Sequence, residues 1–170
     1  MSDQEYFKID GLTITDERER IDRDRFKKAG TRCKCCGSQV KAYRRKIIPS
    51  MVYFLLWLAE EYENFGTVIP HNYREYIHEK GRFPADYTKL QLWGLIKPSG
   101  VSGVWYLTQR GILFARGDLK TSKYLEVYKN KVIGYSKEKA SIRDCFADPF
   151  EYDQIFKTLR ESERETKTGS

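Results

Sequence analysis

Three of the four cysteines of this chain, Cys33, Cys35 and Cys36, fall within four consecutive positions. The spacing Cys33-x-x-Cys36-Gly37 is typical of a zinc knuckle, in which a tight turn supplies two thiolates and the glycine relieves strain in the turn. A structural zinc ion takes four ligands, so one knuckle accounts for half of a site. The sequence therefore predicts a structural zinc ion at Cys33 and Cys36, completed by ligands from elsewhere.

Four other residues are candidates for the missing ligands, and their positions separate them. Cys35 adjoins Cys36, so binding of one ion by both would strain the turn. His71 and His78 are seven positions apart, which is roughly 10 Å along an unbroken helix and too far for both to reach one ion. His71 can join alone if it lies in a loop, whereas Cys145 stands in a stretch typical of a buried thiol. We name Cys35 and His71 as further candidate ligands, the alternative being that each histidine is a surface or capped residue.

The cysteine pattern also bears on the compartment. Three crowded cysteines cannot all pair with one distant cysteine, so reduced thiols or a metal are expected rather than disulfides. No thioredoxin-like βαβ pattern surrounds the pair, which disfavours a redox role. The one long apolar run, residues 51–59, is too short to cross a bilayer, so we expect a soluble, non-secreted protein without membrane contacts.

Positive charge is concentrated in one segment of the chain. The formal net charge is +7, but residues 1–24 carry four basic and eight acidic residues, whereas residues 25–49 carry nine basic residues and no acidic one. Such a segment commonly binds phosphate backbones, because neutralising them releases counterions, although it can also be a solvated face. The candidate phosphate contacts in this segment are Lys41, Arg44, Arg45 and Lys46.

Hydrophobic periodicity and capping signals predict the elements. Two helices are predicted with their caps: 15–29, capped by Thr15, and 50–64, capped by Ser50. Three more are predicted within 71–81, over 84–93 and from Thr108. A short strand is expected within 40–48, and hairpins over 95–108 and 123–136, the second turning at Asn130-Lys131. Short helices follow at 141–146 and 149–159. The predicted regions are a charged helical arm (1–30), a cysteine knuckle and basic segment (31–48), a winged-helix domain (49–120), a C-terminal hairpin with helices (121–160) and a disordered tail (161–170).

Residues 87–117, "YTKLQLWGLIKPSGVSGVWYLTQRGILFARG", resemble the recognition helix, wing and following helix of winged helix-turn-helix proteins. The longer order of a CxxCG knuckle, "YRRKI", "DYTKLQLWGLI", "KYLEVYKNKVIGYS" and "SIRDCF" is similar to a family of small, uncharacterised phage and prophage proteins. These resemblances imply an α+β fold with a winged-helix core and a location in the cytoplasm of a bacterial host cell. They imply no particular activity.

In DNA-binding winged-helix proteins the third helix enters the major groove and the wing touches the adjacent backbone. By position, Thr88, Lys89 and Gln91 would face the groove, with Lys97 on the wing. Asp86 would repel phosphate, and the third helix has no arginine, so this surface departs from that of a strong DNA reader. A protein-binding winged helix is therefore an open alternative for this segment.

The sequence favours a winged-helix protein that binds double-stranded DNA, encoded by a phage as a transcriptional regulator or accessory factor. The alternative is an adaptor or inhibitor that binds a host protein through Tyr73, Tyr76 and Trp105, unless these aromatic residues belong to the core. No phosphate-binding glycine loop, HExxH motif or nucleophile elbow is present, so we do not expect an enzyme. A homodimer is a candidate assembly.

Overall fold

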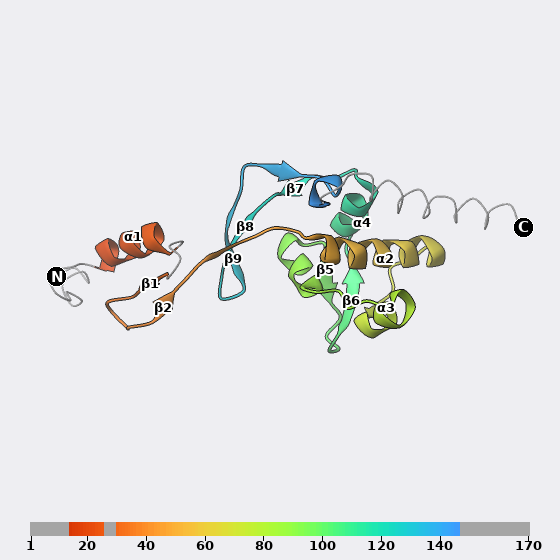
Figure 1. Cartoon of the computed structure of the whole chain (residues 1–170), viewed down its shortest axis with the longest axis horizontal. Helices are drawn as coiled ribbons and strands as arrows, with labels where there is room; N and C mark the ends of the chain where they lie inside the picture. Colours follow the sequence, from red (N-terminus) through yellow and green to blue (C-terminus); the bar gives the residue numbers. More distant parts are fainter. Residues whose placement is uncertain (1–13, 26–29, 147–170) are drawn as a thin grey trace, which may run out of the picture. The chain divides into compact units, whose positions relative to one another are not determined.

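The computed structural model of the chain describes residues 14–25 and 30–146, and its architecture is mixed α+β (Figure 1). This confirms the α+β class predicted from the sequence. The chain divides into two units: unit 1 is Met1–Arg45 with Leu125–Tyr135, and unit 2 is Lys46–Tyr124 with Ser136–Ser170. The predicted helix at 149–159, the predicted tail at 161–170 and positions 26–29 of the first predicted helix lie outside the described residues.

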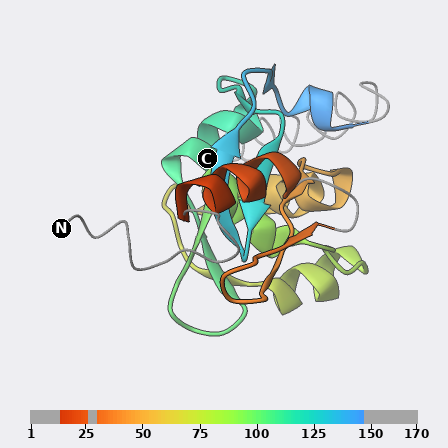
Figure 2. The same cartoon turned by 90° about the vertical axis from the view of Figure 1, so that its left-hand side faces the viewer.

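Unit 1 contains helix α1 (Ile14–Asp24) and a small hairpin of β1 (Thr31–Arg32) and β2 (Gln39–Val40). Asp16 and Glu17 in the first turn and Arg23 in the last turn complement the helix dipole. The two strands are antiparallel and enclose the cysteine loop. Figure 2 shows α1 beside this hairpin, in agreement with the hydrogen bonds described below.

The second part of unit 1 is an antiparallel sheet in the order β3-β8-β9, formed by β3 (Tyr43–Arg45), β8 (Leu125–Tyr128) and β9 (Lys131–Tyr135). The β8–β9 turn is formed by Lys129 and Asn130, which both have positive φ, the conformation that a two-residue type I′ turn requires. The predicted turn at Asn130-Lys131 was one residue too late, because Lys131 already pairs with Tyr128.

Unit 2 is built around helix α2 (Pro49–Phe65), with α3 (Tyr73–Lys80) and α4 (Gln109–Arg116) on opposite sides of it in Figure 1. The prediction that Ser50 caps α2 was wrong. Ile48 is the N-cap residue, Pro49 opens the helix, and the Ser50 hydroxyl donates to the Ala85 carbonyl at 3.1 Å. Proline is preorganised for the first helical position, so the helix starts there.

Aromatic side chains of α2 and its neighbours fill the core of unit 2. Phe54 of α2 contacts Tyr76 of α3 edge-to-face, with ring centroids 5.5 Å apart, and lies 4.7 Å from the Tyr87 ring. Tyr87 in turn contacts Trp105 edge-to-face at 5.9 Å. Tyr76 and Trp105 are therefore core residues, and not the exposed anchors that the protein-binding alternative requires.

A three-stranded antiparallel sheet, in the order β4-β6-β5, completes this layer. Its strands are β4 (His71–Asn72), β5 (Ile96–Pro98) and β6 (Val104–Leu107). The predicted hairpin over 95–108 is confirmed, as are the helix within 71–81, which ends at Gly81, and the start of α4 at Thr108. The Thr108 hydroxyl caps α4 by accepting from the Gly111 N–H at 3.0 Å.

The predicted helix over 84–93 is instead a 3₁₀ helix, η1 (Tyr87–Trp93). Asp86 adopts a left-handed conformation with φ 58°, which separates the preceding residues from the helix. The buried residues Tyr87, Leu90 and Trp93 recur every third position, which matches the three residues per turn of a 3₁₀ helix and not the 3.6 of an α-helix. Burial of this apolar stripe therefore favours the tighter helix.

The remaining elements of unit 2 are β7 (Thr121–Ser122), β10 (Lys139–Ala140) and the short 3₁₀ helix η2 (Arg143–Cys145). Strands β7 and β10 pair antiparallel, and the Trp93 indole donates to the Ser122 carbonyl at 2.9 Å, which joins η1 to β7. Within residues 14–25 and 30–146, no helix is long and apolar enough to cross a membrane.

Candidate nucleic-acid interface

Strand β3 presents a row of cationic and aromatic side chains to solvent. Tyr43, Arg44 and Arg45 are all exposed, since β3 is an edge strand that pairs with β8. Its register with β8 places Tyr43 and Arg45 on one face of the sheet and Arg44 on the other. The Lys41 ammonium and the Arg45 guanidinium lie 5.2 and 5.6 Å from the centre of the Tyr43 ring. Both cations therefore make cation–π contacts with one tyrosine.

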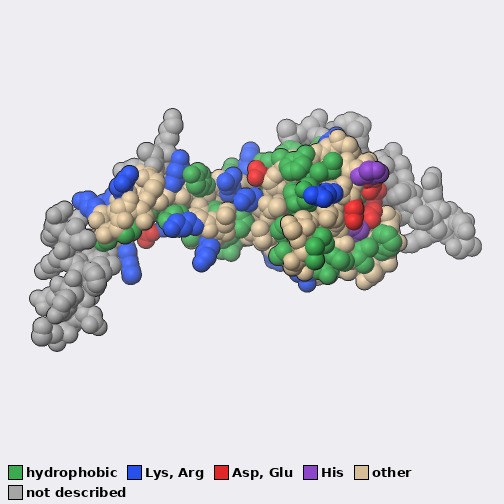
Figure 3. Space-filling view, turned by 90° about the horizontal axis from the view of Figure 1, so that it is seen from below, with side chains coloured by type: hydrophobic (Ala, Val, Ile, Leu, Met, Phe, Trp, Pro, Cys, Tyr) green, Lys and Arg blue, Asp and Glu red, His purple; other side chains and the backbone are tan. Residues whose placement is uncertain are grey.

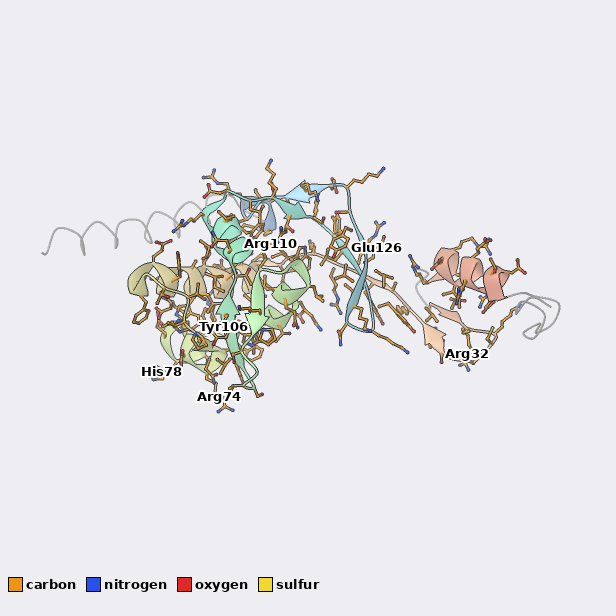
Figure 4. The ribbon with its side chains drawn as sticks, turned by 180° about the vertical axis from the view of Figure 1, so that it is seen from behind. Arg32, Arg74, His78, Tyr106, Arg110 and Glu126 are labelled. Atoms are coloured by element: carbon orange, nitrogen blue, oxygen red, sulfur yellow. The ribbon has the colours of Figure 1, made fainter. Side chains whose placement is uncertain are left out.

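Arg44 faces Glu126 of β8, with 3.8 Å between its guanidinium and the carboxylate. A β-carbon on Gly134 would lie 2.6 Å from the Glu126 carboxylate, so the absence of a side chain on Gly134 leaves room for Glu126. Glu126 is labelled in Figure 4. The Arg44 side chain is 70% exposed, and an ion pair in this setting contributes little energy. Arg44 therefore stays accessible to a phosphate.

The turn of the β8–β9 hairpin adds Lys129 and Lys131, both exposed, and β9 exposes Tyr135. We call this set, which includes residues on both faces of the sheet, the basic sheet surface: Lys41, Tyr43, Arg44, Arg45, Lys129, Lys131 and Tyr135. On the face seen in Figure 3, Lys and Arg side chains, in blue, are spread over the end of the molecule that carries unit 1, and few acidic ones are visible there. This surface combines charge that attracts phosphates with aromatic rings that can stack on bases.

Three acidic residues of α1, Glu17, Asp22 and Asp24, form ion pairs with arginines of their own segment. The Arg20 guanidinium donates to both oxygens of Glu17, at 2.8 and 2.6 Å, and Arg25 forms an ion pair with Asp22. Arg20 also donates to the Thr31 hydroxyl at 2.6 Å, which ties α1 to β1. The ion pairs of Glu17 and Asp22 thus lie within α1 and its end, and Arg44 of β3 pairs with Glu126.

Glu17 is the buried centre of this contact. Besides Arg20, its carboxylate accepts the backbone N–H of Lys34 at 2.7 Å, in the cysteine loop. The hydrogen bond from Arg20, and next that from Lys34, lower the pKa of Glu17 from 4.5 to about 2. One carboxylate therefore joins α1 to the loop that carries Cys33, Cys35 and Cys36.

This gives a pH dependence that can be measured. Because the pKa of Glu17 is lower in the folded chain, the contact stabilises the fold fully above pH 4.5 and is lost as the pH falls from about 4.5 to about 2. An NMR titration of the Glu17 carboxyl should show a midpoint near pH 2. Glu17→Gln should be less stable than wild type at pH 7 and equally stable near pH 2, whereas Glu19→Gln, at an exposed position of the same helix, should change little. A Glu17 midpoint at the ordinary value would contradict this assignment.

The residues predicted on the winged surface lie in unit 2. Thr88 and Lys89 are half-buried in η1, Gln91 is exposed there, and Lys97 is exposed on β5 with its ammonium 5.4 Å from the centre of the Tyr106 ring. Since η1 is a short 3₁₀ helix, it is not the long α-helix that reads a major groove in helix-turn-helix proteins. The structure thus gathers Lys41, Arg44 and Arg45 in unit 1, whereas Lys46 is the first residue of unit 2.

Tyr43 was not among the sequence candidates, and neither were Lys129, Lys131 and Tyr135 of the β8–β9 hairpin. The sequence pattern did predict their hairpin, because "KYLEVYKNKVIGYS" alternates around a turn. Their proximity to β3 depends on the pairing of β8 with a strand far away in the chain, which no local pattern reveals.

The cysteine loop joins β1 to β2 as a tight exposed turn. The Cys33 N–H donates to the Ser38 carbonyl at 2.9 Å, and the Gly37 N–H donates to the Cys33 carbonyl at 2.8 Å. Gly37 has φ +69°, which an L-residue adopts at a cost, as the knuckle spacing predicted. Cys33 lies within hydrogen-bonding reach of both Cys35 and Cys36.

The hydroxyl of Ser38, and then its backbone N–H, donate to the Cys36 sulfur and lower the pKa of this thiol. Such hydrogen bonds orient thiolates at metal sites and stabilise their charge. The pKa of Cys35 is raised, by desolvation first and by the neighbouring Cys33 second. Cys33 and Cys36 therefore fit a zinc ion better than Cys35 does, but they supply two of its four ligands.

The other candidate ligands have partners within unit 2. His71 is buried in β4, not in a loop, with Nδ1 3.2 Å from the Glu75 carboxylate and its ring edge-to-face with Trp57 at 5.2 Å. The Cys145 thiol donates to the Ser141 carbonyl at 3.5 Å, and burial raises its pKa to about 12. Among the described residues, no three His, Cys, Asp or Glu side chains form a group that could hold a metal ion.

No family model matches the chain, and comparisons with curated proteins and with solved structures give no significant match. The resemblances to winged-helix proteins and to a phage family remain predictions. The function is therefore inferred from the side chains and charges described above.

Proposed function

We propose that this protein binds double-stranded DNA, with the basic sheet surface and Lys46 as its main contacts to phosphates. The observation that carries the proposal is the exposure of Arg44 and Arg45 on β3, an edge strand. Their side chains lie on opposite faces of the sheet. The major groove of B-DNA admits a two-stranded antiparallel ribbon, and the β8–β9 hairpin, with lysines at its turn, has that form.

We propose further that unit 2 is a variant winged-helix module. The support is its order of elements, helix α2, strand β4, helices α3 and η1, then the β5–β6 hairpin, with the three strands in one antiparallel sheet. In this variant Thr88, Lys89, Gln91 and Lys97 are additional contacts and the basic sheet surface supplies most of the affinity. We assign the protein a regulatory or accessory role; the resemblance to phage proteins adds only that it would be encoded by a phage and act in a bacterial cell. The protein-binding alternative lacks its proposed anchors, because Tyr76 and Trp105 are buried and Tyr73 stacks on Tyr87.

Binding to a random duplex should depend steeply on salt. Six cations, Lys41, Arg44, Arg45, Lys46, Lys129 and Lys131, would give a slope of about −5 in log affinity against log salt concentration. Fluorescence anisotropy should accordingly show an affinity loss of roughly 10³-fold between 50 and 200 mM salt.

Single-stranded DNA of the same length is the comparison in this experiment, since exposed tyrosines also stack on unpaired bases. Absence of binding at 50 mM salt, or an affinity that salt does not change, would refute DNA binding. Tighter binding of the single strand would refute the assignment to duplex DNA.

A further inference from the structure

Cys33 and Cys36 of the cysteine loop offer two thiols, whereas a structural zinc site takes four ligands. The whole sequence has four cysteines and two histidines, and outside the loop these are Cys145, His71 and His78. All three belong to unit 2. His71 contacts Glu75 and Trp57, and the Cys145 thiol donates to the Ser141 carbonyl. His78 is exposed on α3 and would add one ligand at most.

The Glu17 carboxylate, which contacts the loop, has its own hydrogen-bond partners. Glu17 accepts three hydrogen bonds, two from Arg20 and one from the Lys34 N–H, so its oxygens are oriented toward donors and not toward the thiols. The loop itself is exposed from Lys34 to Ser38, whereas Cys33 is half-buried. A metal ion in solvent can therefore reach the loop.

A second copy of the chain would supply the two zinc ligands that one copy lacks. Two loops contribute four thiolates, which is the ligand set of a structural tetrahedral zinc site, Cys₄. Four thiolates and one Zn²⁺ carry a net charge of −2, and each copy brings cations next to its thiols, Lys34 within the loop and Lys129, whose charge acts on Cys36. The thiol protons pass to the solvent when the metal binds.

We propose that Cys33 and Cys36 of two copies of the chain bind one zinc ion between them, and that this shared Cys₄ site links the copies as a dimer. Because each copy provides the same two residues, the contact is symmetric and closes at two chains. This inference does not depend on DNA binding.

The stoichiometry of the metal tests the proposal. Full-length protein, freed of metal by a chelator and kept reduced, is titrated with Co²⁺, whose thiolate charge-transfer and d–d absorption bands report tetrahedral sulfur ligation. We expect saturation at half an equivalent of metal per chain, displacement by Zn²⁺, and a mass by light scattering twice the 20.1 kDa of one chain. Chelator should restore the single-chain mass.

Variants assign the ligands. Cys33→Ser and Cys36→Ser should each abolish the cobalt bands and the doubled mass, whereas Cys145→Ser should retain both. If a loop variant fails to fold, the titration of the wild-type chain still decides the question. Saturation at one equivalent with a single-chain mass, no metal uptake, or a doubled mass that survives Cys36→Ser or chelator would each overturn the proposal.

Discussion

A variant with Arg44→Ala, Arg45→Ala and Lys46→Ala should bind random duplex DNA roughly 10² to 10³-fold more weakly than wild type at 0.1 M salt. Each lost phosphate contact removes the release of about 0.9 counterions, so three contacts change the affinity by nearly three powers of the salt concentration. For the same reason the slope of log affinity against log salt should become less steep by about 3. Anisotropy titrations at several salt concentrations measure both quantities.

The matched control removes the same charge elsewhere. Arg74, Arg110 and Lys137 are exposed cations of unit 2, two of which are labelled in Figure 4, and their replacement by Ala leaves the same net charge as the β3 variant. We expect this control to retain most of the affinity. An equal loss in both variants would mean that overall charge attracts the DNA and that β3 is not its contact.

Gly111→Ala should be the most damaging conservative substitution in unit 2. A β-carbon at Gly111 would lie 2.2 Å from the Leu95 carbonyl oxygen and 2.7 Å from a Leu107 methyl carbon, so α4 would have to move away from the β5–β6 hairpin. Overpacking of this kind costs about 3 kcal/mol. The better helix propensity of alanine offsets about 1 kcal/mol of this cost. The free energy of unfolding should therefore fall by about 2 kcal/mol or more.

Chemical denaturation of the two proteins measures this difference. Gln109→Ala, at an exposed position of the same helix, is the control, and it should change the free energy of unfolding by less than about 0.5 kcal/mol. If Gly111→Ala were as stable as wild type, the close approach of α4 to Leu95 would not exist in solution.

Much of unit 2 could be predicted because its signals are local. An apolar run behind Pro49 predicted α2, and Thr108 predicted the start of α4. Two incorrect predictions, the Ser50 cap and the α-helix over 84–93, also concern local sequence patterns. In each case two patterns in the same stretch favoured different structures. Ser50 is a good capping residue, yet the proline beside it begins the helix, and the three-residue spacing of Tyr87, Leu90 and Trp93 was read as an α-helix although it fits a 3₁₀ helix.

The candidate site was less predictable because it depends on pairing between distant segments. The exposure of Arg44 and Arg45 followed from their charge, but their neighbours Glu126 and Gly134 could be known only once β3 had paired with β8. Similarly, "TDERER" predicted a charged arm, and nothing in it distinguished Glu17, which is buried against the cysteine loop, from the exposed Glu19.

The β8–β9 hairpin leaves unit 2 after Tyr124 and returns at Ser136, and these two residues are joined by backbone and side-chain hydrogen bonds of 3.0 Å. Unit 1 is consequently discontinuous, since β3 precedes the elements from α2 to β7 and the strands that pair with it follow them. During synthesis β3 would leave the ribosomal exit tunnel early. It could pair with β8 only after the whole α2–β7 segment had been synthesised. We infer that the β3-β8-β9 sheet forms late in biosynthesis, after the arginines of β3 have left the exit tunnel.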